Sequence, residues 1–127
     1  MMESLKQIKG MPQLVQSLPK EYRSFSLFTI LLRLEYEKDF DYENWTDIYH
    51  VKLLVSDVDE RYKILILLKN VHGTVSFMAG GPLSGFAISD MREYGFERSQ
   101  RFYVYDYENR DLCIHCEDIE VALQKAQ

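Results

Sequence analysis

The side chains best suited to metal or redox chemistry are two cysteines that lie close together in Cys113-Ile114-His115-Cys116. Thiolates and imidazole bind zinc, and a C-x-x-C pair can support disulfide exchange. On an extended strand, however, residues three apart point to opposite faces, so the two thiols would diverge. The chain has no second C-x-x-C to complete a four-ligand site. We therefore expect no metal ion and no cofactor, and interpret both cysteines as small residues packed in a strand.

The histidines and serines do not form a recognisable catalytic group. His50, His72 and His115 are far apart in the sequence, so nothing brings one beside the partner that a general base needs. Ser84 lies in Gly-Pro-Leu-Ser-Gly, which is not the G-x-S-x-G pattern of a nucleophilic serine. The segment 80–85 lacks the Gly-Lys-Ser/Thr ending of a phosphate-binding loop. The sequence thus nominates no catalytic residue, and we expect a protein that is not an enzyme.

Acidic and aromatic side chains alternate around residues 35–47, and this block carries the main functional hypothesis. Such a negative field attracts a basic partner and speeds association, and a buried aromatic side chain can anchor the contact. The positions that we nominate for partner binding here are Asp39, Asp41, Tyr42, Glu43, Trp45 and Asp47. A solvated loop that only improves solubility is the alternative. The spacing does not match an EF-hand calcium loop, so we expect no metal here either.

A second candidate surface is the row Tyr103, Tyr105 and Tyr107, which would share one face of a strand opposite Phe102 and Val104. Tyrosines on an outward face offer large, rigid contact area of the kind enriched in protein interfaces. The alternative is a second buried face of a sandwich. The sequence does not decide which face of this strand is buried.

Composition excludes several classes of protein. The chain has 127 residues, a formal net charge of -5 and 46% hydrophobic residues, which indicates one folded domain over residues 1–127. The longest apolar run, Ile64–Leu68, is far shorter than a membrane span, and residues 1–10 do not resemble a secretory signal. Net acidity argues against nucleic acid as the partner. We expect a cytoplasmic protein with reduced thiols and no membrane contact.

The elements that must position these residues begin with helix and change to strand. Leu5, Ile8, Leu14, Val15 and Leu18 predict one or two short amphipathic helices, broken at Gly10-Met11-Pro12 and ended by Pro19. Period-two patterns then predict strands. The expected strands are 28–36, 49–55, 62–68, 74–78, 85–91, 101–107 and 111–117.

Polar and glycine-containing segments predict the connections. We expect connections or turns at 38–46, 57–60, 70–73, 80–82, 94–96 and 108–110, and a final helical turn within 119–126. Helices followed by consecutive strands indicate an α+β fold with a mainly antiparallel, curled or sandwiched sheet of about six or seven strands.

Short segments spread over residues 44–120 resemble the small β-rich immunity proteins of bacterial toxin systems. The segments that carry the resemblance are Asn44-Trp45-Thr46-Asp47, Lys69-Asn70-Val71, Gly85-Phe86-Ala87-Ile88-Ser89-Asp90, Tyr94-Gly95-Phe96, Tyr103-Val104-Tyr105-Asp106-Tyr107-Glu108 and Cys116-Glu117-Asp118-Ile119-Glu120. The resemblance implies a non-enzymatic cytoplasmic inhibitor that binds and neutralises one cognate toxin, often a basic nuclease. It supplies no binding residues position by position.

The leading hypothesis is therefore a binding protein that neutralises a basic bacterial toxin by direct contact. Two alternatives stay open: a small-ligand binding or enzymatic domain with a pocket in the curled sheet, and a structural subunit of an assembly.

Overall fold

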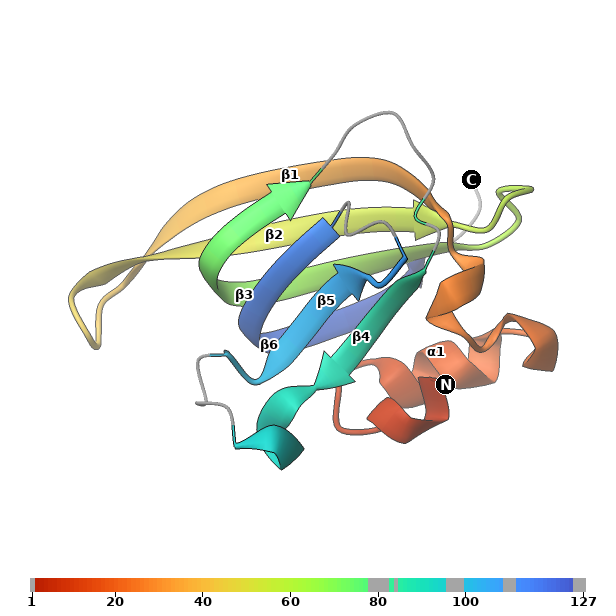
Figure 1. Ribbon diagram of the computed structural model, residues 1–127, viewed down its shortest axis with the longest axis horizontal. Coiled ribbons are helices and arrows are strands. Elements are labelled where there is room, and N and C mark those ends of the chain that lie inside the picture. Colours follow the sequence, from red (N-terminus) through yellow and green to blue (C-terminus); the bar gives the residue numbers. More distant parts are fainter. Residues whose placement is uncertain (1, 78–82, 84, 96–99, 109–111, 125–127) are drawn as a thin grey trace.

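The computed structural model describes residues 2–77, 83, 85–95, 100–108 and 112–124. It is an α+β fold in which helical segments precede one six-stranded antiparallel sheet, ordered β1-β2-β3-β6-β5-β4 and not closed (Figure 1). The expected fold class is thereby confirmed. The strands are β1 (Ile30–Asp41), β2 (Thr46–Ser56), β3 (Lys63–Phe77), β4 (Phe86–Asp90), β5 (Phe102–Asp106) and β6 (Leu112–Gln124).

Among the described residues there is one α-helix, α1 (Met11–Ser17), and there are four short 3-10 helices, of which three lie with α1 in the N-terminal segment and one follows β4. The 3-10 helices are η1 (Met2–Leu5), η2 (Lys20–Tyr22), η3 (Phe25–Leu27) and η4 (Met91–Tyr94). The predicted break at Gly10-Met11-Pro12 is where α1 begins, because Gly10 adopts φ +88° and the proline in the first turn needs no N–H partner. None of the helices in the described ranges is long and apolar enough to cross a membrane.

The hydrophobic core lies between this N-terminal layer and one face of the curved sheet. Leu5, Ile8, Leu14 and Leu18 are all buried and pack in the same cluster as the sheet residues. The sheet contributes Val51, Leu53, Val55, Ile64, Ile66, Leu68, Phe102, Val104, Ile114, Cys116, Ile119 and Val121. In β1 a bulge at Leu32 shifts the alternation, so Leu31 and Leu34 pack on the core and Leu32 is exposed.

The expected turn at 70–73 is wrong, because β3 runs through it and joins the two predicted strands 62–68 and 74–78. Asn70 does take a positive φ of 54°, but inside the strand. Leu68 and Val71 are both buried although they are three apart, and Cys116 and Ile119 of β6 repeat this spacing. The alternation of core-facing side chains therefore shifts by one residue on both strands, where β3 and β6 curve sharply in Figure 1.

Two further expectations are wrong. Residues 38–46 are mostly paired strand, because β1 continues to Asp41 and β2 begins at Thr46. The final helical turn is absent over the described part of 119–126, because Ile119 and Val121 pair with β3 and face the core. The turns expected near 80–82, 94–96 and 108–110 lie wholly or partly outside the described residues.

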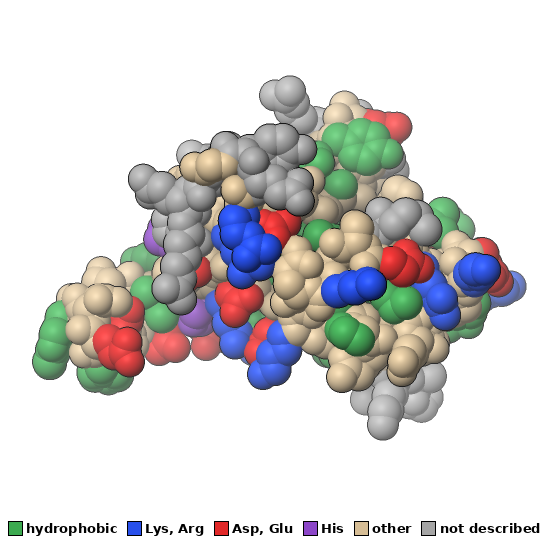
Figure 2. Space-filling view, turned by 90° about the horizontal axis from the view of Figure 1, so that it is seen from below, with side chains coloured by type: hydrophobic (Ala, Val, Ile, Leu, Met, Phe, Trp, Pro, Cys, Tyr) green, Lys and Arg blue, Asp and Glu red, His purple; other side chains and the backbone are tan. Residues whose placement is uncertain are grey.

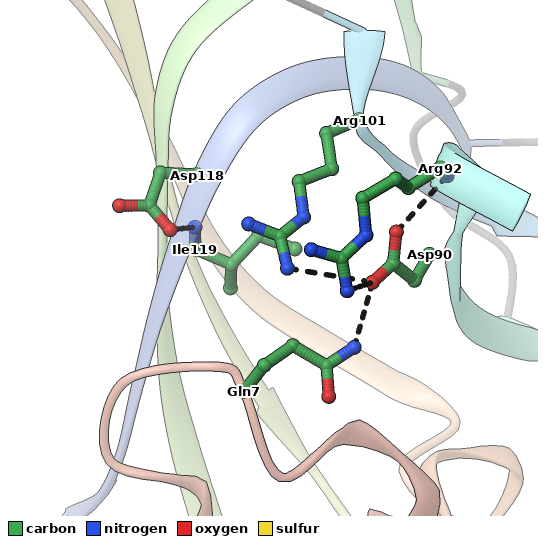
Figure 3. A network of polar contacts seen from close by, with 6 residues as sticks. All are labelled: Gln7, Asp90, Arg92, Arg101, Asp118 and Ile119. Atoms are coloured by element: carbon green, nitrogen blue, oxygen red, sulfur yellow. Dashed lines mark hydrogen bonds and ion pairs between the residues drawn. The ribbon is translucent and has the colours of Figure 1, made fainter. Parts of the chain in front are cut away.

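A network of hydrogen bonds and ion pairs connects the N-terminal layer to the end of β4 (Figure 3). The Asp90 carboxylate accepts hydrogen bonds from Gln7 Nε2 at 2.7 Å and from the Arg92 backbone N–H at 3.0 Å, and Arg101 Nη2 lies 3.5 Å away. Burial raises the pKa of Asp90, but these hydrogen bonds and the nearby Arg101 charge together lower it below its ordinary value.

Candidate partner-binding site

The hairpin of β1 and β2 extends beyond the rest of the sheet and forms an arm, residues 35–50. β2 pairs with β3 from Val51 to Ser56, whereas the part from Thr46 to His50 pairs with β1. Figure 1 shows the hairpin continuing past the point where β3 and β6 curve away. Because β1 and β2 continue past the bend of β3 and β6, the end of the arm, residues 39–48, lies outside the core.

The two faces of β1 in the arm differ in chemistry because successive side chains alternate. Glu35, Glu37, Asp39 and Asp41 follow one face, and Tyr36, Lys38 and Phe40 follow the other. On the second face the rings of Tyr36 and Tyr49 stack at 5.4 Å between centroids. The alternation expected for a strand thus sorts the carboxylates from the aromatic rings.

The tip of the arm is a four-residue turn from Tyr42 to Trp45, organised by Asp41. Asp41 Oδ1 accepts the Glu43 backbone N–H at 2.9 Å, and Oδ2 accepts Asn44 Nδ2 at 2.8 Å. The hydrogen bond from the Asn44 side chain is the largest cause that lowers the pKa of Asp41 below its ordinary value. The aspartate therefore stays ionised while it holds the turn.

Three aromatic rings gather at this tip and two of them are largely exposed. Phe40 contacts Tyr42 and Trp45 edge to face, with centroid distances of 5.0 and 5.8 Å. Tyr42 is 75% exposed and Trp45 is 77% exposed. Trp45 also adopts φ +52°, a left-handed conformation that is costly for a bulky residue. Folding alone does not explain a large exposed ring at such a position.

The net negative charge of the protein is concentrated in the arm. Residues 35–50 contain six carboxylates and one lysine, a net of -5 that equals the formal charge of the whole chain. Lys38 Nζ lies 3.5 Å from Asp47 and Lys52 Nζ lies 3.9 Å from Glu37. On the face in Figure 2, the end of the arm shows hydrophobic and acidic side chains but no lysine or arginine, whereas the body shows basic side chains interspersed with acidic ones.

A groove of about 510 Å³ lies between the arm and β3, and we call it the fork groove. Its lining residues are Tyr36, Asp41, Asn44, Thr46, Asp47, Ile48, Tyr49, Asn70, Val71 and His72. At the apex, His50 Nδ1 accepts the Asn70 backbone N–H at 3.1 Å. At the point where the strands separate, the backbone N–H of Asn70 in β3 therefore bonds to a side chain of β2 instead of to the β2 backbone.

The structure brings together Asp39, Asp41, Tyr42, Glu43, Trp45 and Asp47 on the arm, but it places the tyrosine row elsewhere. Tyr103 and Tyr105 of β5 stack at 4.4 Å and are half-buried on the face opposite the buried Phe102 and Val104. Tyr107 lies beyond the strand, 55% exposed, beside Gly85. The sequence did not decide which face of this strand is buried, and in the structure it is the face of Phe102 and Val104.

The two cysteines lie on opposite faces of β6, whereas two of the three histidines are brought together by the pairing of β3 with β6. Cys116 is buried in the core, where burial raises its pKa to about 12, and Cys113 lies on the other face beside the Tyr103 hydroxyl at 3.0 Å. His72 and His115 are cross-strand neighbours, and His115 stacks on Tyr103. Among the described residues, no three His, Cys, Asp or Glu side chains are grouped so that they could hold a metal.

Sequence reasoning missed Tyr36 and Tyr49 as part of the site, because their period-two positions indicate ordinary strands, and it missed Phe40, which lay in the expected connection 38–46. It also missed Asn70 and His72, which come from a distant segment and reach the fork groove only through the pairing of β2 with β3. No known protein family, curated protein or solved structure was found to match this chain.

Proposed function

We propose that this chain is a non-enzymatic binding protein that neutralises a basic protein, in the manner of a cytoplasmic bacterial immunity protein, and that the arm is its contact surface. The observation that carries the proposal is the exposed ring cluster of Tyr42 and Trp45 within a segment that bears a net charge of -5. Negative charge steers a basic partner toward the arm, and the rings supply apolar area to be buried on contact.

The sharpest test measures binding to a panel of basic bacterial toxin domains, made as inactive variants, at about 50 and about 300 mM salt. We expect one domain to bind with an association rate that falls as salt rises. Reversing Asp39, Asp41, Glu43 and Asp47 to Lys should slow this association about tenfold or more and weaken its salt dependence.

The matched control reverses four exposed carboxylates outside the arm. Reversal of Glu21, Asp59, Glu60 and Glu108 to Lys changes the total charge equally. If both variants slow association alike, only net charge matters and the arm is not the contact surface. If the arm variant associates normally, the proposal is wrong. A Trp45→Ala variant should instead raise the dissociation rate of the complex, because the ring is buried only after the two proteins have met.

A further inference from the structure

We propose that the basic partner enters the fork groove as an extended strand that pairs with residues 46–50 of β2. Its lysine or arginine side chains would lie beside Asp41 and Asp47. This inference rests on the proposed function and specifies how the same surface recognises its partner.

The first observation is an unpaired strand edge. In the described part of the chain, residues 46–50 of β2 pair only with β1, since pairing with β3 begins at Val51. Their other edge borders the fork groove. Backbone N–H and C=O groups at such an edge are ready to pair with an incoming strand.

The second observation is that this edge lacks the usual protection. Its sequence, Thr-Asp-Ile-Tyr-His, contains neither proline nor lysine and favours strand. By contrast, β6 is covered at Val121, whose N–H donates to the Lys9 carbonyl at 2.9 Å, and β1 carries a bulge and Lys38. Within the described chain, residues 46–50 of β2 therefore have neither a covering segment nor a bulge, lysine or proline that would hinder pairing with a further strand.

The lining of the groove indicates the chemistry of the strand. Asp41 and Asp47 supply negative charge, and the stacked rings of Tyr36 and Tyr49 supply an apolar wall. His72 lines the same groove, and its Nε2 is buried without a hydrogen-bond partner in the described chain. A strand alternates its side chains, so a segment alternating basic and apolar residues fits. A second copy of this chain would instead bring one acidic arm against another.

The test uses capped peptides of about six residues that alternate lysine with valine, isoleucine or tyrosine. Backbone N-methylation of every second residue removes the N–H groups on one edge of the peptide and leaves its charge intact. Two peptides are compared, one methylated at the odd residues and one at the even residues, and we call these the two methylation phases. We expect one phase to weaken binding about tenfold and the other to change it less than about twofold. Hydrogen exchange of the amides in residues 46–50 should slow when the unmodified peptide binds.

Asp47→Asn should weaken peptide binding about threefold, and Asp59→Asn, an equal charge change in the β2–β3 turn, should leave it unchanged. No binding, equal loss in both methylation phases, or no slowing of exchange at 46–50 overturns strand addition. If raising the protein concentration without peptide slows the exchange of these amides, a second copy of the chain fills the groove. That result would also overturn the proposal. If a basic toxin domain nevertheless depends on the arm charges, only the strand pairing is wrong and the proposed function stands.

Discussion

Trp45 combines a costly backbone conformation with 77% exposure, so neither backbone preference nor burial favours a large ring at this position. Its left-handed φ disfavours a bulky side chain, and glycine would adopt it freely. The ring nonetheless contacts Phe40 and Tyr42 edge to face. Such a residue is best explained by the surface that it presents.

Trp45→Gly should therefore change the free energy of unfolding by less than about 1 kcal/mol, because relief of backbone strain offsets the lost ring contacts. Binding of the basic toxin domain should nevertheless be strongly weakened. Denaturant unfolding and binding kinetics measure the two effects separately. A large loss of stability would show instead that the ring mainly supports the hairpin.

Asn44→Ala should raise the pKa of Asp41 toward its ordinary value of 3.8, because it removes the side-chain hydrogen bond that most lowers it. In the native protein the lowered pKa means that the ionised carboxylate stabilises the turn above pH 3.8. This stabilisation is lost as the pH falls through the lowered pKa. A carboxyl NMR titration measures the shift, with Gln13→Ala on α1 as the control. An unchanged titration of Asp41 in Asn44→Ala would contradict the turn geometry.

At the scale of elements, the junction between α1 and β6 depends on close backbone approach at Gly10. Gly10 adopts φ +88°, and a Cβ there would overlap the Val121 carbonyl. The Lys9 carbonyl also accepts the Val121 N–H, so the N-terminal layer covers the edge of β6 at this point. One glycine thus allows both the start of α1 and its docking on the sheet.

Gly10→Ala should lower the free energy of unfolding by at least about 2 kcal/mol, from conformational strain and overlap together. Gly95→Ala is the matched control, since Gly95 has φ +78° but none of the described residues lies within 4 Å of its added Cβ. Strain alone should cost that variant about 1 kcal/mol. Urea denaturation measures both changes, and equal losses would exclude close packing at Gly10 as the cause.

At the scale of the whole molecule, the arm and the core are separate in both charge and packing. The core cluster reaches the sheet from Val51 onward, and the end of the arm contributes no buried side chain among residues 39–48. The arm carries the whole excess of negative charge. The residues that stabilise the fold and the proposed contact surface thus lie in different parts of the molecule.

Replacing residues 39–48 by Asn-Gly should retain the fold, because Lys38 and Tyr49 already lie opposite each other and a two-residue turn can join them. The change removes four carboxylates and no cation, so the formal charge becomes -1 instead of -5. We expect unfolding free energy within about 1 kcal/mol of the natural chain, and binding lost. Circular dichroism with denaturant titration provides the measurement. Loss of cooperative unfolding would show that the arm belongs to the core.

Sequence patterns predicted the α+β class and most strands, because the period of hydrophobic side chains is a local property. The buried face of β3 up to Leu68 follows from its alternation, and the clustering of Asp41, Tyr42 and Trp45 follows from their adjacency. The expected turn at 70–73 and the final helical turn failed because pairing between β3 and β6 overrides local turn and helix signals at Asn70 and Ile119.

By itself the sequence determined the fold class and the concentration of acid and aromatic residues in one segment. Only the tertiary structure decided that this segment is a projecting hairpin whose strand alternation separates Asp39 from Phe40, that Phe102 rather than Tyr103 faces the core, and that Asn70 and His72 border the groove. The reason is physical: the edge of β2 becomes free where β3 bends away, and such a separation arises from contacts between residues distant in the chain.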